Sequence, residues 1–270
     1  MTNARPLEIS SLSKSFDTPA GPITVVKNFN VRIQPGEFVA LLGHSGCGKS
    51  TVLSIVAGLQ TATLGGIVVD GVEVTEPGLE RAFCFQSPSL LPWLTAIENV
   101  LLSASQAHPK LVPAKQRELA NKYLNLVGVG EYAAGLPASL SQGTQQRVAI
   151  ARALAQEPRF LLLDEPFGML DSLTRFELQD LVIDLWEKDR KTVIMVTHDI
   201  DEALYLCDRI ILMTDGPEAT VGLDLRVTLP RPRHRHQATS HPEYQRLRDR
   251  IIAFLESHSK QFQIEEKEAA

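Results

Sequence analysis

The residues best suited to chemistry begin with a glycine-rich segment at residues 43–50, which reads Gly-His-Ser-Gly-Cys-Gly-Lys-Ser. It fits the pattern GxxxxGK[ST] of a phosphate-binding loop, and it lies between an apolar run and a segment with helical periodicity at residues 51–59. Glycines let the backbone turn its N–H groups toward phosphate oxygens, and the positive end of the helix dipole favours an anion there. We expect Lys49 to reach the β- and γ-phosphates of a nucleotide and the Ser50 hydroxyl to bind Mg²⁺. The full set expected at the nucleotide is Gly43, His44, Ser45, Gly46, Cys47, Gly48, Lys49, Ser50 and Thr51.

Two carboxylates form the second candidate group. The apolar run at residues 160–163 ends in Asp164 and Glu165, which places both at the carboxyl edge of a parallel sheet, where ligands of open α/β folds bind. Asp164 is suited to hold Mg²⁺ through its water shell, and Glu165 to orient and polarise an attacking water. The alternative is a solvated pair that caps a helix, and the phosphate-loop pattern upstream disfavours it.

A histidine is the third candidate. The apolar run at residues 192–197 ends on His198, and a histidine at that strand end can contact a γ-phosphate or hold the attacking water in line with Glu165. A lone histidine is more often a structural residue, but three strand ends converging on one sheet edge favour a catalytic role.

The elements that must position these residues follow from hydrophobic patterning. Near-continuous apolar runs at residues 38–42, 160–164, 192–197 and 210–214 are typical of strands buried on both faces. Residues 23–33 and 66–74, the latter with an Asp70-Gly71 turn, indicate an antiparallel flank. Helical periodicity at residues 90–155, with Leu119, Tyr123, Leu126 and Val127 on one face, indicates an inserted helical subdomain. We therefore predict the α/β class: a P-loop NTPase core with an antiparallel β flank and an inserted helical subdomain.

The domain prediction divides the chain near residue 229. We predict one P-loop NTPase domain at residues 1–229, with the helical subdomain at about 90–155, and a basic linker with a helical tail at residues 230–270. In the tail, a helix is predicted at residues 242–258 with Tyr244, Leu247, Ile251 and Leu255 along one stripe. For the arginines and histidines of residues 231–236 a solvated linker is expected, and contact with anionic lipid or a regulatory domain are the alternatives.

Composition bounds the possible partners. The chain has 270 residues, of which 44% are hydrophobic and 22% charged, the balance of a soluble globular protein, and its net charge of -5 argues against nucleic acid as a partner. The three cysteines, Cys47, Cys84 and Cys207, lie too far apart for a disulfide framework or a zinc site. No apolar run approaches the ~18 residues of a membrane span, and residues 1–10 lack a signal-peptide core. Any membrane association is therefore expected to come through a partner.

At residues 140–147, Leu-Ser-Gln-Gly-Thr-Gln-Gln-Arg followed by a helix resembles the LSGGQ signature of the ABC ATPase family, and the likeness extends over residues 7–216. The resemblance implies ATP hydrolysis with Mg²⁺ by a head-to-tail pair of ABC ATPase chains, the second being a paralogue or another copy. It places Ser141, Gln142, Gly143 and Thr144 against the ATP held by the opposite subunit. Gln142 and Thr144 depart from the family pattern, which puts the turnover rate in question, whereas Ser141 and Gly143 are retained.

Three further residues acquire roles through the same resemblance. Gln86 matches the family's Q-loop glutamine, which acts in catalysis, contacts Mg²⁺ and water, and links to the membrane subunits. Asp171 matches the D-loop that spans the dimer interface. Phe16 stands where the family carries an aromatic residue that stacks on adenine, and a core phenylalanine is the alternative. His44 departs from the usual loop residue, and we expect this to be tolerated because the position contributes mainly its backbone.

The subfamily is indicated by residues 77–86, 90–100, 164–175 and 214–217, which resemble importer ATPases of the nitrate, bicarbonate, cyanate, sulfonate and taurine group. The tail at residues 229–233, followed by Tyr244, resembles the nitrate and bicarbonate branch. The resemblance implies the motor subunit of an ABC importer for a small anion such as nitrate or bicarbonate, an ATPase coupled to transport. A sulfonate or taurine importer ATPase and a soluble ABC ATPase of the iron–sulfur assembly type are the alternatives.

The partners implied are transmembrane permease subunits and a periplasmic or lipid-anchored solute-binding protein, with this chain bound peripherally at the cytoplasmic face of the inner membrane. We expect a short helix of the permease to dock at residues 86–93, because exposed Leu91 and Trp93 would be explained by such a partner. Burial of these side chains in the chain's own core is the alternative.

Overall fold

The computed structural model describes residues 5–19 and 21–258, so the expectations for residues 1–4 and 259–270 lie outside the described residues. The chain divides into two compact units. The first unit consists of Met1–Pro77 and Thr192–Ala270, and the second unit is Gly78–Lys191. The segment predicted to be helical, residues 90–155, lies within the second unit.

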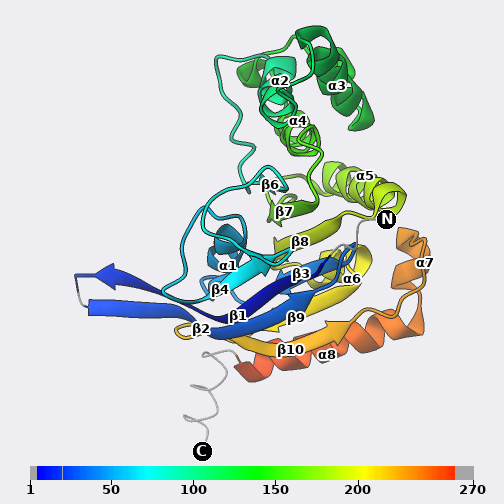
Figure 1. The fold of residues 1–270 in the computed structure, drawn as a ribbon. Helices are drawn as coiled ribbons and strands as arrows, with labels where there is room; N and C mark the ends of the chain where they lie inside the picture. The colour runs from blue at the N-terminus through cyan, green and yellow to red at the C-terminus, as the bar shows by residue number, and fades with distance from the viewer. Residues whose placement is uncertain (1–4, 20, 259–270) are drawn as a thin grey trace, which may run out of the picture. The chain divides into compact units, whose positions relative to one another are not determined.

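The antiparallel flank is a sheet of the first unit with strand order β2-β1-β4-β5 (Figure 1). Its strands are β1 (Leu7–Thr18), β2 (Gly21–Ile33), β4 (Leu64–Val69) and β5 (Val72–Glu73). Asp70 and Gly71 join the last two strands with φ angles of 56° and 86°, the left-handed pair that a tight hairpin turn requires. The predicted flank and its turn are therefore confirmed.

The buried strands of the first unit lead into the candidate site residues. In β3 (Phe38–Leu42) every residue is buried, and the strand pairs in parallel with both β8 (Thr192–Thr197) and β9 (Arg209–Met213). β10 (Val221–Arg226) extends this sheet antiparallel to β9. Apolar side chains on both faces explain why these strands read as continuous hydrophobic runs. The strand predicted at residues 210–214 begins and ends one residue earlier in the structure.

Four helices accompany these strands in the described part of the first unit. They are α1 (Lys49–Val56), α6 (Ile200–Leu206), α7 (Arg235–Thr239) and α8 (Pro242–His258). The predicted bounds of α8 are confirmed, and Tyr244, Leu247 and Ile251 are its buried residues. The helix after the phosphate loop begins at Lys49 rather than at residue 51.

The basic segment before α7 corrects the prediction of a solvated linker. Arg233 is buried, and its guanidinium donates to the carbonyl oxygens of Leu204, Tyr205, Cys207 and Leu229 at 2.7–3.4 Å. Arg231 donates to Asp208 at 2.8 Å and to the carbonyl of Leu206 at 2.7 Å. These arginines satisfy backbone acceptors around the end of α6, so the segment is part of the packed structure.

The second unit joins a short parallel strand pair to helices. β6 (Arg81–Cys84) pairs with β7 (Phe160–Asp164). The helices are α2 (Ala96–Ala107), α3 (Pro113–Leu126), α4 (Gln142–Leu154) and α5 (Ser172–Asp189), with 3-10 turns at Gly130–Tyr132 and Pro137–Ser139. On α3 the buried residues are Ala120, Tyr123 and Leu124, with Val127 just after it, whereas Leu126 is exposed. Leu126 was therefore assigned to the wrong face, because Leu124 and Leu126 both fit the apolar pattern in that turn.

Within the residues that the structure describes, no helix combines the length and apolar character needed to cross a membrane. Cys47, Cys84 and Cys207 are all buried free thiols.

Candidate nucleotide site and docking groove

The phosphate loop leaves the carboxyl end of β3 and enters α1. Gly46 and Gly48 adopt φ angles of 80° and 98°, which favour glycine. A Cβ atom at Gly48 would lie 2.7 Å from the Val26 side chain, so space also requires glycine there.

Lys49, the first residue of α1, is only 5% exposed, and its Nζ donates to the carbonyl oxygens of Gly43 and His44 at 2.8 Å each. The loop therefore holds a buried cation beside glycine N–H groups, an arrangement suited to a phosphate chain.

Cys47 lies inside the loop with its Sγ 4.0 Å from the Lys49 Nζ. Burial raises the pKa of the Cys47 thiol, and the Lys49 ammonium opposes part of that rise. The thiol is consequently neutral at ordinary pH, and it contacts Lys49, the lysine for which phosphate binding is predicted.

His44 contributes more than its backbone. Its carbonyl accepts a hydrogen bond from Lys49, and its side-chain Nε2 lies 3.1 Å from the carbonyl oxygen of Leu255 in α8. The side chain thus adds a contact of its own to the backbone contribution expected at this position.

His198 follows β8 at the same edge of the sheet as the phosphate loop. Leu42 of β3 and Thr197 of β8 are paired in the parallel register, so Gly43 and His198 are the next residues on two neighbouring strands. His198 is exposed, and Asp199 beyond it caps α6 through the Glu202 N–H. The expected convergence of the loop and the histidine is found within this unit.

Phe16 lies on β1, opposite Ile23 of β2. Its side chain is 38% exposed, and the Lys14 Nζ lies 5.0 Å from the ring centroid. The alternative of a core phenylalanine is excluded by this exposure, and the ring is available to stack on a planar ligand.

The carboxylates of the second unit follow β7. Glu165 has a φ of 43°, an uncommon value for a residue with a Cβ atom, and its Oε2 accepts a hydrogen bond of 3.1 Å from the Gln86 side chain. The structure therefore brings Gln86 and Glu165 together, as their expected shared role requires. Asp164 ends the strand itself and is half-buried.

The signature segment forms the beginning of α4. Ser141 is the N-cap, and its Oγ accepts from the Thr144 N–H at 3.1 Å and lies 2.9 Å from the Thr144 Oγ1. Ser141 and Gln142 are exposed, with Gly143 and Thr144 half-buried. The departure at Thr144 thus places a second hydroxyl beside that of Ser141.

Asp171 caps α5. Its Oδ1 accepts from the N–H groups of Leu173 and Thr174 at 3.1 Å each, and hydrogen bonds from the side chain and backbone of Thr174 lower the pKa of its carboxyl. The same residue therefore serves as a helix cap as well as the D-loop candidate.

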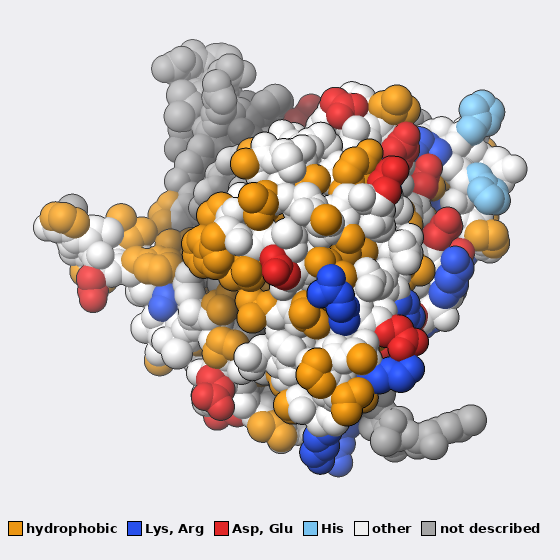
Figure 2. Space-filling model, turned by 90° about the horizontal axis from the view of Figure 1, so that it is seen from above, with side chains coloured by type: hydrophobic (Ala, Val, Ile, Leu, Met, Phe, Trp, Pro, Cys, Tyr) orange, Lys and Arg blue, Asp and Glu red, His pale blue; other side chains and the backbone are white. Residues whose placement is uncertain are grey.

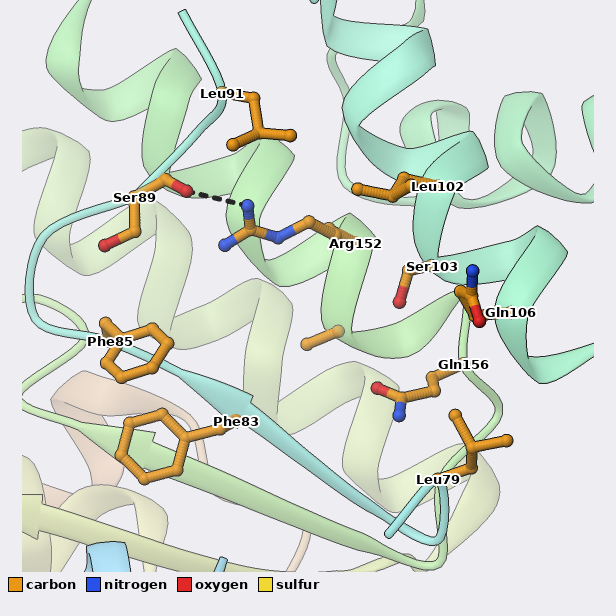
Figure 3. A pocket seen from close by; sticks show the side chains of 11 residues that line it. Leu79, Phe83, Phe85, Ser89, Leu91, Leu102, Ser103, Gln106, Arg152 and Gln156 are labelled. Carbon is orange, nitrogen blue, oxygen red and sulfur yellow. Dashed lines mark hydrogen bonds between the residues drawn. The ribbon is translucent and has the colours of Figure 1, made fainter. Parts of the chain in front are cut away.

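A groove of about 440 Å³ opens in the second unit beside the segment that follows Gln86 (Figure 3). Phe83, Phe85, Leu91 and Leu102 supply apolar walls, and Arg152 of α4 lies between them. Arg152 donates to the carbonyl oxygens of Ser89 at 2.8 Å and Pro88 at 3.1 Å. Sequence reasoning missed Arg152, and the only signal was an arginine in the otherwise small and apolar last turns of the helix that follows the signature.

Several large hydrophobic side chains in or near the groove segment are exposed. Trp93 is 70% exposed, and Leu79, Phe85 and Leu102 are also exposed. Figure 2 views the molecule from above and shows hydrophobic side chains gathered over the left and centre of that face, with most of the charged side chains toward the right. Burial of Trp93 in the chain's own core is therefore excluded, and Leu91 is half-buried at the groove.

A family model described as "ABC transporter" matches residues 26–168, which include the phosphate loop, both carboxylates and the signature. The chain belongs to the ABC transporter family. The predicted family resemblance, ATPase class and P-loop fold with its helical insertion are confirmed.

Relatives within this ABC family agree in detail. The chain is 46% identical over 249 residues to the "Nitrate import ATP-binding protein NrtD" of Synechococcus elongatus, covering 92% of this chain and 91% of the relative. It is 45% identical over 249 residues to the "Bicarbonate transport ATP-binding protein CmpD" of a Synechocystis strain, covering 92% and 88%. The resemblance to the nitrate and bicarbonate branch is thus confirmed.

The fold is shared with an ABC cassette of known structure. The dimeric post-hydrolysis structure of the ATP-binding cassette MJ0796 bound to ADP and Pi matches with a TM-score of 0.74 and 34% sequence identity. The match covers 83% of this ABC chain and 100% of that chain.

Proposed function

We propose that this chain is the ATP-hydrolysing motor subunit of an ABC importer for a small anion, either nitrate or bicarbonate. The single observation that carries the enzymatic part is a phosphate loop with a buried Lys49 in a chain whose Glu165 is held by Gln86. The solute class rests on the names of the nitrate and bicarbonate relatives, which are similar to this chain over nearly its whole length.

ATP binding is assigned to the phosphate loop and Phe16. Lys49 exchanges its carbonyl partners, Gly43 and His44, for the β- and γ-phosphates, and the glycine N–H groups complete the anion site. Phe16 stacks on the adenine ring, for which its exposed position on β1 is suited.

Hydrolysis is assigned to Glu165, His198 and Gln86. The Glu165 carboxylate accepts a proton from the attacking water, Gln86 holds that carboxylate through its 3.1 Å hydrogen bond, and His198 contacts the γ-phosphate and steadies the geometry.

Mg²⁺ fits the donor set of Ser50, Asp164 and Gln86, because it prefers oxygen ligands and is usually held by one or two carboxylates together with substrate phosphates. When bound, the ion neutralises phosphate charge.

Pairing with a second ABC ATPase chain is proposed from the exposed signature. Ser141, Gln142, Gly143 and Thr144 stand at the N-terminus of α4, where hydroxyl and N–H groups favour an anion, and the relevant anion is the ATP of the opposite subunit. Asp171 lies at that interface. The MJ0796 cassette, whose structure is described as dimeric, supports this pairing.

The groove of the second unit is proposed as the seat of the permease. A short cytoplasmic helix of a transmembrane subunit places apolar side chains against Phe83, Phe85 and Leu91 of the groove, and the exposed Trp93, two residues beyond Leu91, joins the contact. The chain then sits peripherally at the cytoplasmic face of the inner membrane, in a system that includes a solute-binding protein.

The nucleotide assignment is tested with Lys49→Ala. The change removes a charged donor to phosphate, so ATP binding should weaken by roughly 10- to 100-fold, with loss of turnover. Titration calorimetry and a phosphate-release assay measure the two effects. Lys27→Ala is the control, because Lys27 is an exposed lysine of the same unit that pairs with Glu218. Unchanged ATP affinity in Lys49→Ala would refute the assignment.

The solute is tested on the complex with its permease and solute-binding protein. Nitrate or bicarbonate should stimulate its ATPase, and taurine should not. Stimulation by taurine alone would replace the small-anion proposal with a sulfonate importer.

A further inference from the structure

The side chain of His44 bridges the phosphate loop and the last turn of α8. Its Nε2 lies 3.1 Å from the carbonyl oxygen of Leu255, a residue 211 positions further along the chain. A carbonyl oxygen can only accept, so His44 Nε2–H is the donor. The carboxylate of Asp215 lies 3.9 Å from the same nitrogen. Both ends of the contact belong to the first unit.

The last turn of α8 is held in position by the packing of the helix, so it can in turn hold the side chain of His44. The helix is fixed by buried Tyr244, Leu247 and Ile251, and the Tyr244 hydroxyl is hydrogen-bonded to Asp201 at 2.9 Å. Nearer its end, the ring of Phe254 covers Gly222 of β10 so closely that a Cβ atom there would lie 2.3 Å from the ring. The Leu255 carbonyl is therefore presented to His44 by a packed element rather than by a loose tail.

The backbone of His44 also contacts Lys49. The carbonyl oxygens of Gly43 and His44 each accept a hydrogen bond of 2.8 Å from Lys49 Nζ. A shift of His44 would move one of these carbonyls and change the backbone path between Gly43 and Ser45. Fixing the imidazole therefore fixes the part of the loop that holds the ammonium before phosphate arrives.

We propose that the last turn of α8 positions the phosphate loop through His44 and thereby raises its affinity for nucleotide. The inference rests on the proposed function, in which this loop binds ATP. His44 is a positioning residue, because a loop already held in place loses less conformational freedom when the nucleotide binds. The C-terminal region of the chain thus has a direct influence on the nucleotide site.

The test compares three changes. His44→Ala removes the donor, His44→Gln keeps an amide donor at similar reach, and ending the chain at Ala253 removes the Leu255 carbonyl while keeping Tyr244, Leu247 and Ile251. His44→Ala and the shortened chain should each raise the Kd and KM for ATP by about 2- to 10-fold, the worth of one hydrogen bond, with little change in kcat. His44→Gln should restore most of the affinity.

His44→Ala and the shortened chain remove the same hydrogen bond, so the rise in the Kd for ATP should be no larger when the two changes are combined than in either alone. Ser257→Ala is the matched control, because it removes a hydroxyl from the same turn that bonds Phe254 and His258 and leaves the loop untouched. It should bind ATP as the parent chain does. Parent-like affinity in His44→Ala, or effects that multiply in the combined variant, would overturn the proposal.

Hydrogen exchange separates this proposal from the assignment of ATP to the loop. Without nucleotide, the amides of residues 43–48 should exchange faster in His44→Ala and in the shortened chain than in the parent or in Ser257→Ala. Unchanged exchange in His44→Ala overturns the positioning role. If the variants exchange faster than the parent chain but the parent chain does not bind ATP, the proposed function is refuted and the positioning role of His44 stands.

Discussion

Glu165 combines a reactive side chain with an unusual backbone. Its φ of 43° lies in the left-handed region, where a residue with a Cβ atom costs about 1–3 kcal/mol, and such positions concentrate at functional sites. The Gln86 side chain holds the carboxylate at 3.1 Å. Backbone and neighbour together direct one oxygen of Glu165, which is what activation of a water molecule needs.

Glu165→Gln should therefore retain ATP binding and slow hydrolysis by roughly 10²- to 10⁴-fold, because the amide cannot accept the proton of the attacking water. Single-turnover phosphate release and an equilibrium binding assay measure the two effects. Glu118→Gln, on an exposed position of α3, is the control and should hydrolyse ATP at the parental rate. Normal turnover in Glu165→Gln would move the general-base role to another residue.

Cys47 offers a chemical probe of the loop. Because burial raises its pKa, little thiolate is present at neutral pH, and alkylation should be slow and should accelerate as the pH rises toward and beyond 9. ATP should protect the thiol, and modification should abolish hydrolysis. Mass spectrometry gives the rate at each cysteine, with buried Cys84 and Cys207 as internal controls. Equal rates with and without ATP would place Cys47 away from the nucleotide.

At the scale of elements, the buried guanidinium of Arg233 fastens the segment from Arg231 to α8 to the rest of the first unit. Arg233 donates to carbonyl oxygens at the end of α6 and to that of Leu229. Its charge is neutralised in part by Asp208, at 3.9 Å. Burial is tolerated because the planar fork satisfies several acceptors at once.

Arg233→Met should lower the free energy of unfolding by about 3 kcal/mol, because several buried carbonyl groups lose their donor. Denaturant unfolding followed by circular dichroism measures the change. Arg246→Ala, which removes an exposed arginine of α8, should change stability by less than about 1 kcal/mol. Equal stabilities of the two variants would show that Arg233 does not fasten the tail.

The sequence predicted the elements whose signals are local. The strands at 38–42, 160–164 and 192–197 were found because they are short apolar runs bounded by polar residues, and the α8 stripe was found because its apolar residues recur with helical spacing. Leu126 was placed on the wrong face of α3 because neighbouring leucines fit the same period.

Long-range contacts could not be predicted in this way. The hydrogen bonds of Arg233 join it to residues between 4 and 29 positions away in the sequence. The contact of His44 with Leu255 joins residues 211 positions apart. Nothing in either segment identifies its partner. At the site, the loop glycines and Glu165 were readable as motifs. Arg152 was not, because its role depends on where the chain after Gln86 passes over α4.

At the scale of the whole molecule, the proposed reaction draws on both units. The phosphate loop, Phe16 and His198 belong to the first unit, whereas Glu165, Gln86 and the signature belong to the second. The groove lies in the second unit alone. A partner seated in the groove would therefore engage the unit that carries Glu165, the proposed general base.

The chain has two tryptophans that differ in exposure, so its intrinsic fluorescence can report on binding at one of them. Trp186 is buried, bonded through its indole nitrogen to the Lys191 carbonyl and covered by Arg190, so its emission should stay constant. Trp93 lies in water, and its fluorescence should shift to shorter wavelength when the permease covers it. The spectrum recorded on mixing with permease in detergent measures this shift, and Trp93→Phe should abolish it. An unshifted spectrum on formation of the complex would mean that the indole of Trp93 stays exposed to solvent and that the permease binds at another surface.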